Sequence, residues 1–240
     1  MKRLESFQTA RHRRQRLFRS IQFLIIFFIL FQFIDTYLVT SVAAVSVTME
    51  PSIHPGDRLV VLPSAYGLER LFARGKIAVR SPMRGDVVLI RPPSSEPIPW
   101  VRAAVINVSD FLTLRSIKSL ANAIGPKLIK RVVALPGDSV RMNDFIIQVR
   151  VAGTGHYLTE YEVSGLSYDI RTKRLPDGWT DELPLSGTFP DKQLGPDEYF
   201  VIGDDRLSFS DSRLFGPISA DHILGKVAFC YWPFKRQPFN

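Results

Sequence analysis

The chain has 240 residues, enough for one apolar segment and one domain with a hydrophobic core. Most of its net charge of +8 comes from residues 1–20, which contain seven Lys or Arg side chains against a single Glu. The remainder carries only +2, so a nucleic-acid-binding surface is not indicated. Cys230 is the sole cysteine, which excludes an intramolecular disulfide, and its apolar neighbours predict a buried thiol.

The basic residues 1–20 precede an apolar segment that predicts a transmembrane helix over 21–43. The alternative is a cleaved secretory signal, because small residues at 42–44 follow the apolar run. We prefer the anchor, since the run is longer than the apolar region of a usual secretory signal. Basic residues favour the cytoplasmic side, so we expect a single-pass protein of the cytoplasmic membrane with residues 44–240 outside. Membrane lipid is therefore an expected partner of the protein.

Residues 44–240 predict a mainly β domain. Short runs rich in Val, Ile, Leu and Phe recur between Gly and Pro residues, over 58–62, 86–90, 129–135, 139–142, 145–151, 199–202 and 226–231. This pattern favours an all-β barrel or sandwich. An insertion at 92–127 departs from it, because apolar residues within 100–124 have helical spacing. This segment either packs on the domain or lies on the membrane surface.

Four sequence blocks occur in a fixed order after the apolar segment. The first runs from Ser46 to Ser52 and contains Thr48, and 55–67 continues it. The others cover 84–90, 129–138 and 203–217. Together they resemble the type I signal peptidases, membrane-bound Ser/Lys endopeptidases that remove signal peptides from exported preproteins. Four matches in order are specific, whereas any one alone is weak.

The resemblance implies a hydroxyl-lysine dyad. Thr48 stands where the family has its serine nucleophile, and Lys130 stands at the general base. The Thr48 amide and the Ser46 hydroxyl would form the oxyanion hole. The resemblance also implies supporting roles for Met49, Pro51, Arg131, Asp204, Ser208, Ser210, Asp211 and Arg213. No cofactor or metal is implied, and the acidic loop 204–211 lacks the glycine and glutamate of a calcium-binding loop.

A lysine base is also favoured by the residues themselves. None of the four histidines lies in a recognisable catalytic spacing. For Lys130 to accept a proton near neutral pH, its pKa must fall towards 7 or 8, which burial on an apolar strand can supply. Strand alternation places Arg131 on the opposite face from Lys130, so the permanent cation points away from the base.

Two departures from the family pattern concern the reacting groups. Thr48 adds a β-methyl that restricts χ1 and crowds the nucleophile. Phe209 stands where the family has a serine that orients the lysine, and Ser208 or Ser210 would take that role if the loop is shifted by one residue. Asp205 also replaces the usual asparagine, whereas Asp211 and Arg213 are expected to form an ion pair.

Three hypotheses follow. The leading one is a membrane-anchored endopeptidase that removes signal peptides through Thr48 and Lys130 by way of an acyl-enzyme. The second is a catalytically impaired homologue that binds signal peptides or partner proteins at the membrane. The third, an unrelated anchored β domain with a binding role, requires four accidental motif matches.

Overall fold

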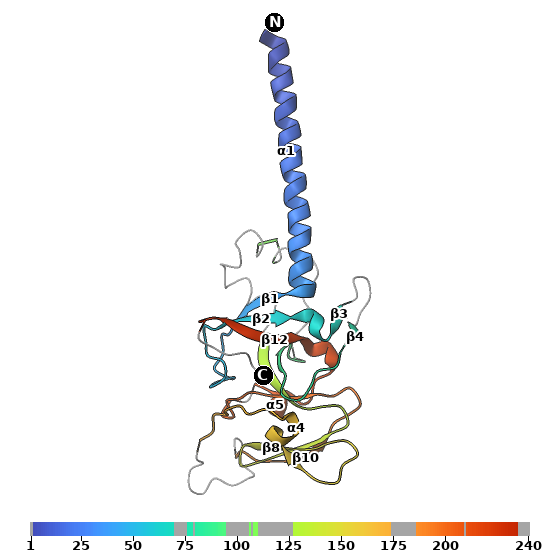
Figure 1. Ribbon diagram of the computed structural model, residues 1–240, viewed down its shortest axis with the longest axis vertical. Helices are drawn as coiled ribbons and strands as arrows, with labels where there is room; N and C mark the ends of the chain where they lie inside the picture. Colours follow the sequence, from blue (N-terminus) through green and yellow to red (C-terminus); the bar gives the residue numbers. More distant parts are fainter. Residues whose placement is uncertain are drawn as a thin grey trace. The chain divides into compact units, whose positions relative to one another are not determined.

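A computed structural model describes residues 2–69, 76–78, 80–94, 106, 108–109, 127–173, 186–208 and 210–234. The chain divides into two units, one of residues 1–38 and 98–124 and the other of residues 39–97 and 125–240 (Figure 1). The second unit contains all four sequence blocks. The predicted insertion at 92–127 lies mostly outside the described residues. Within it, residues 106, 108 and 109 are described and are helical.

The first unit begins with helix α1, Lys2–Phe33, which a short π-helix, Ile34–Leu38, continues. Residues Arg13–Phe33 form a 21-residue stretch in which an 18-residue window has a mean hydropathy of 1.6, long and apolar enough to cross a membrane. The predicted transmembrane helix over 21–43 is wrong at its end, because Thr40–Ala43 forms strand β1. The backbone groups of β1 pair with strand β2, Arg58–Leu62, and the β-branched side chains of Thr40 and Val42 suit that conformation.

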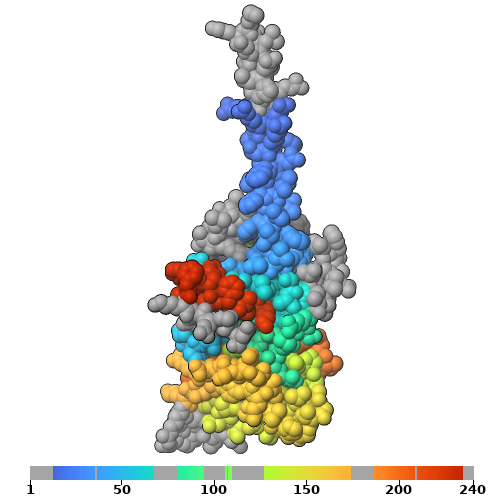
Figure 2. All heavy atoms as spheres, in the orientation of Figure 1, coloured from blue at the N-terminus to red at the C-terminus, as the bar shows by residue number. Residues whose placement is uncertain are grey.

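The second unit is built around a six-stranded antiparallel sheet in the order β1, β2, β12, β5, β6, β11. Its other strands are β12, Ile223–Trp232, β5, Val87–Ile90, β6, Leu128–Ala134, and β11, Phe200–Ile202. The C-terminal strand β12 pairs with both β2 and β5, and its red residues lie beside the cyan residues of β2 on the surface (Figure 2). This pairing brings the two ends of the second unit into one sheet.

Two smaller sheets complete the second unit. Four strands pair in the order β10, β7, β8, β9, over Phe189–Gln193, Ser139–Asn143, Ile146–Arg150 and Leu158–Thr159. Strands β3, Gly67–Glu69, and β4, Lys76–Ala78, form a hairpin. The helices are short: α4, Glu160–Ser164, α5, Ser212–Phe215, and single 3-10 turns at Pro63–Ala65 and Ala220–His222. The prediction of a mainly β protein with an N-terminal apolar helix is confirmed.

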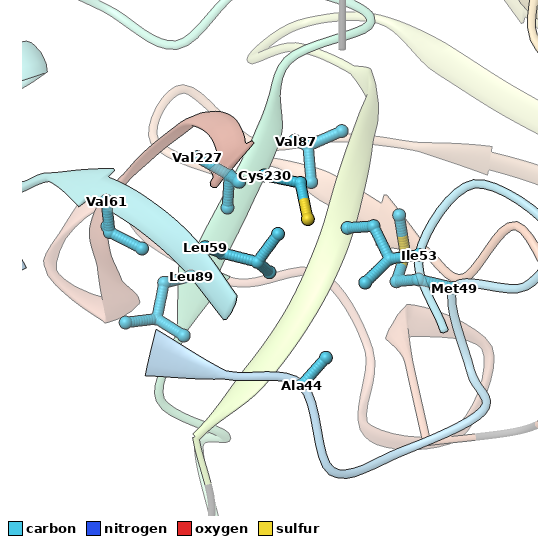
Figure 3. Close-up of a cluster of buried hydrophobic side chains, with 9 residues drawn as sticks. All are labelled: Ala44, Met49, Ile53, Leu59, Val61, Val87, Leu89, Val227 and Cys230. Carbon is cyan, nitrogen blue, oxygen red and sulfur yellow. The ribbon is translucent and has the colours of Figure 1, made fainter. Parts of the chain in front are cut away.

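One hydrophobic cluster joins the six-stranded sheet to the first sequence block (Figure 3). Its buried members are Ala44, Met49, Ile53, Leu59, Val61, Val87, Leu89, Val227 and Cys230. Cys230 is 4% exposed, as its apolar neighbours predict. Removing these side chains from water stabilises the fold by about 25 cal/mol for each Å² of apolar surface, so the first block is fixed to the sheet by burial.

Candidate active site

Thr48 lies in a tight turn between β1 and β2. The amide of Glu50 donates to the Val47 carbonyl at 2.9 Å, and the amide of Ile53 donates to the Met49 carbonyl at 2.8 Å. Met49 and Ile53 are 2% and 0% exposed and extend into the cluster of Figure 3. These two side chains anchor the turn, and Thr48 between β1 and β2 is itself buried.

Lys130 lies on β6, in register with Val88 on β5. Its side chain is fully buried, and its Nζ has no hydrogen-bond partner among the described residues. Burial lowers the pKa of Lys130 to about 8, although the nearby Asp211 carboxylate acts in the opposite direction. The ammonium therefore loses its proton far more readily than a solvated lysine.

Thr48 and Lys130 meet around Gly203, the residue that follows β11. A Cβ added to Gly203 would overlap the carbonyl oxygen of Thr48 and would lie 3.3 Å from Lys130 Nζ. Only glycine fits there without displacing one of them. The Thr48 main chain and the Lys130 amine are thus close together, although Lys130 Nζ has no hydrogen-bond partner within the described part of the chain.

Ser46 and Pro51 flank the turn. The backbone amide of Thr48 donates to the Ser46 hydroxyl oxygen at 3.2 Å, so the two oxyanion-hole candidates are adjacent and paired with each other. Ser46 is exposed. Pro51 is also exposed and follows a cis peptide bond with Glu50.

A cavity of about 60 Å³ opens beside Thr48. Its walls are formed by residues 42–46, 48–49 and 127–129, and Ile53 completes it. Except for Ser46, Thr48 and Lys127, its lining side chains are apolar and include two alanines. A cavity of this size and lining suits a small apolar group more than a large or charged one.

Asp204 joins the first block to the lysine strand. It is fully buried, accepts a hydrogen bond from the Ser52 hydroxyl at 2.5 Å, and binds the Arg131 guanidinium through both carboxylate oxygens. Arg131 also donates to the Gly85 carbonyl at 3.0 Å. Arg131 is therefore buried and paired, and it supports the strand on the side away from Lys130.

The predicted ion pair between Asp211 and Arg213 is present, with Nη2 2.8 Å from Oδ2. Asp211 also accepts from the Gly203 amide at 3.2 Å, so it fixes the glycine that separates Thr48 from Lys130. Arg213 donates through its guanidinium to the main-chain carbonyls of Arg206 and Ser208. These bonds hold the loop 203–213 from within.

Ser208 and Ser210 do not orient the lysine in this structure. Ser208 is half-buried and Ser210 is exposed, and neither hydroxyl makes a hydrogen bond with Lys130 Nζ. The main chain of Ser208 is held by two hydrogen bonds, with its carbonyl accepting from Arg213 and its amide donating to the Asp205 carbonyl. Phe209, the second departure from the family pattern, lies outside the described residues.

The sequence model described as "Signal peptidase, peptidase S26" matches residues 17–232. The chain belongs to this family. The family prediction from the four blocks is therefore confirmed, whereas the replacement of serine by Thr48 as the nucleophile stays a prediction.

This S26 chain is similar in sequence to several bacterial signal peptidases. A signal peptidase I of Bacillus caldolyticus is 36% identical over 114 residues, which are 47% of this chain and 57% of that protein. A signal peptidase IB of Staphylococcus aureus is 32% identical over 117 residues, 47% and 56% of the two chains. A probable signal peptidase I-1 of Synechocystis is 26% identical over 190 residues, 79% and 69% of the chains. The chain thus spans little more than half the length of the first two relatives.

A solved signal peptidase I from Enterococcus faecalis is 17% identical to this S26 chain. Its TM-score is 0.33, over 62% of this chain and 99% of that one.

A buried polar group outside the four blocks also supports the site of this S26 protein. The Tyr168 ring lies under the Arg131 guanidinium, 3.7 Å from its carbon, and the Tyr168 hydroxyl donates to Glu160 at 2.5 Å. Glu160 in turn pairs with Arg206, and both are fully buried. Burial and the Glu160 carboxylate raise the pKa of Tyr168, so it stays neutral. Sequence reasoning missed Tyr168 and Glu160 because no local pattern connects them to the lysine strand.

Proposed function

We propose that this chain is a membrane-anchored endopeptidase that removes N-terminal signal peptides from exported preproteins. The observation that carries the proposal is Lys130, a buried amine without a hydrogen bond to any described residue and with a pKa of about 8, positioned with Thr48 around Gly203. A neutral amine next to a hydroxyl is the arrangement that hydroxyl nucleophiles require. Membership of the signal peptidase family gives the reaction class.

The proposed reaction has two steps. The Thr48 hydroxyl oxygen attacks the scissile carbonyl carbon while Lys130 Nζ takes its proton. The peptide C–N bond then breaks, and the ammonium returns the proton to the leaving amine, which leaves an ester on Thr48. Lys130 next takes a proton from water, whose oxygen attacks the ester, and returning that proton to Thr48 releases the new carboxylate.

The oxyanion would be stabilised by two adjacent donors. The Thr48 amide now donates to the Ser46 hydroxyl oxygen. When substrate binds, rotation of the Ser46 side chain frees the Thr48 amide. The amide and the Ser46 hydroxyl then both donate hydrogen bonds to the oxyanion of the substrate. Loss of one such donor typically costs a factor of about 10² to 10³ in kcat.

The proposed substrate is an extended peptide with a small residue before the cut. The cavity beside Thr48 is about 60 Å³ and mostly apolar, which favours alanine-like side chains. Its walls at 42–46 come from the edge strand β1 and the residues that follow it. Its walls at 127–129 come from the beginning of β6. The pairing of β6 with β11 begins at Arg131, so both walls offer backbone groups to an extended chain.

The proposed anchor is helix α1, whose apolar stretch Arg13–Phe33 has membrane-spanning length. The basic residues in 1–20 favour a cytoplasmic N-terminus, with residues 44–240 outside the membrane. Thr48 follows the apolar stretch closely in sequence, so in this orientation it lies outside the membrane, shortly after the span. Signal peptides that emerge from the bilayer would then reach the site.

The test is cleavage of a preprotein with an alanine before the cut, by the full-length chain in detergent. The variants are Thr48→Ala and Lys130→Ala, with Thr154→Ala and Lys192→Ala as matched controls on exposed positions. We expect cleavage by the unsubstituted chain and both controls, with the new amino terminus identified by mass spectrometry, and none by the two site variants. Equal cleavage by all five proteins would overturn the proposal. Cleavage that appears only after Thr48→Ser would instead support the impaired homologue.

A further inference from the structure

We propose that Arg171 is a positioning residue for Thr48, acting through Glu50. The proposal deepens the proposed function, on which it rests, and it concerns a residue outside the four sequence blocks. Arg171 Nη1 lies 2.5 Å from Glu50 Oε2, and Glu50 is two residues after Thr48 in the turn. The ion pair therefore joins the turn that carries the nucleophile to a segment 121 residues later in the chain.

Backbone hydrogen bonds place three segments side by side at this point. The Asp205 amide donates to the Thr48 carbonyl at 3.1 Å. On its other side, the loop pairs with Arg171: the Arg171 amide donates to the Asp204 carbonyl, and the Arg206 amide donates to the Arg171 carbonyl, each at 2.9 Å. The loop 203–206 thus lies between the Thr48 turn and the segment that carries Arg171.

The Arg171 side chain closes this arrangement into a ring. The backbone connects Thr48 to Asp205 and the loop to Arg171, and the Arg171 guanidinium then returns to Glu50. Tyr168, three residues before Arg171, stacks on Arg131 and fixes the start of the same segment to the lysine strand. A closed ring resists small shifts of the turn better than the Asp205–Thr48 and Ser52–Asp204 bonds would without the ion pair.

Positioning matters here because Thr48 is a hindered nucleophile. Its β-branch restricts χ1, so the direction of the hydroxyl follows the backbone of the turn closely. A shift of about 1 Å at a reacting group can cost about 10²-fold in rate. The ion pair itself is partly exposed, with Arg171 52% and Glu50 21% accessible, so it adds little to global stability. Its loss should affect turnover and local opening more than unfolding.

The experiment compares full-length Arg171→Ala and Glu50→Ala with Arg150→Ala, which removes the partly exposed Arg150–Asp191 pair elsewhere in the domain. We measure kcat and KM for preprotein cleavage, the Tm, and amide hydrogen exchange of peptides that cover 203–208. For the two ring variants we expect kcat to fall about tenfold at unchanged KM, faster exchange at Asp205 and Arg206, and the same Tm as Arg150→Ala. The double exchange Glu50→Arg with Arg171→Glu should recover part of both losses.

Two results would overturn the proposal. One is exchange at 203–208 in Arg171→Ala that matches Arg150→Ala, a result that needs no catalytic activity. The other is a rise in KM at constant kcat, which would make Arg171 a substrate contact. If the unsubstituted chain does not cleave, the proposed function fails by itself, and hydrogen exchange still decides whether Arg171 holds the turn.

Discussion

Arg131 binds both carboxylate oxygens of Asp204, with Nε 2.9 Å from Oδ1 and Nη2 2.7 Å from Oδ2. Both side chains are almost completely buried, and Lys130 is the preceding residue on the same strand. The Asp204 carboxylate favours the charged form of Lys130, and Arg131 is the cation that pairs with this carboxylate. We therefore expect the charge state of Lys130 to depend on whether Asp204 keeps this partner.

Replacing Arg131 by Gln tests this relationship. The change leaves the Asp204 carboxylate buried without its partner, which we expect to cost about 3–5 kcal/mol of unfolding free energy. The unpaired carboxylate should also raise the pKa of Lys130, so the pH profile of cleavage should move to higher pH. Denaturant unfolding and kcat/KM against pH measure the two effects. Arg141→Gln, on the exposed face of β7, is the control, and a profile that did not move would contradict the coupling.

The pH dependence of cleavage should report Lys130. Its pKa is lowered to about 8 by burial, and it acts as a base only when neutral. Therefore kcat/KM should rise about tenfold per pH unit below pH 8 and level off above it. Initial rates between pH 6 and 10 at substrate concentrations well below KM give this curve. A profile that continues to rise up to about pH 10 would show that the base has the pKa of a solvated lysine.

Lys130→Met should inactivate the protein and stabilise it at neutral pH. The pKa of Lys130 falls from 10.5 unfolded to about 8 folded, so below pH 8 the folded state holds a buried charge at a cost of about 3 kcal/mol. Methionine removes that cost. Between pH 8 and 10.5 the native protein loses the proton first, so its own stability rises and the advantage of the variant shrinks.

Denaturant unfolding of Lys130→Met at pH 7 and pH 10 measures this difference. Lys192→Met, at an exposed position on β10, should change the unfolding free energy little at either pH. If Lys130→Met did not raise the unfolding free energy at pH 7, burial would not destabilise the charged amine and the prediction would be wrong.

Thr48→Ser should increase kcat by about 2- to 20-fold. Serine keeps the hydroxyl and removes the β-methyl, which frees χ1 and reduces crowding near the scissile carbonyl. KM should change little, because the other residues that line the cavity are unaltered. Steady-state kinetics compare the variant with Thr154→Ser, a control in an exposed turn. A decrease in kcat would show that the methyl group fixes the productive rotamer of Thr48.

Local patterns in the sequence determined most of the strands. Residues 58–62 form β2 as predicted, and the predicted segment 129–135 differs from β6 by one residue at each end. These runs are short, apolar and bounded by turn residues, so their conformation follows from nearby side chains. The predicted C-terminal end of the transmembrane helix was wrong. Residues Thr40–Ala43 continue the apolar segment in sequence, yet they form a strand that pairs with β2. Strand pairing depends on a partner that a local apolar pattern does not contain.

The sequence alone also determined the family and the two candidate reacting groups, Thr48 and Lys130, because these are fixed by residue type and spacing within short blocks. Tertiary structure decided how they meet, around Gly203, and that Ser208 and Ser210 do not reach the lysine. It also decided which residues hold the site from outside the blocks, Tyr168 and Arg171 among them. Burial and pairing between distant segments lower the pKa of a lysine and orient a turn, and these long-range effects leave no pattern in the local sequence.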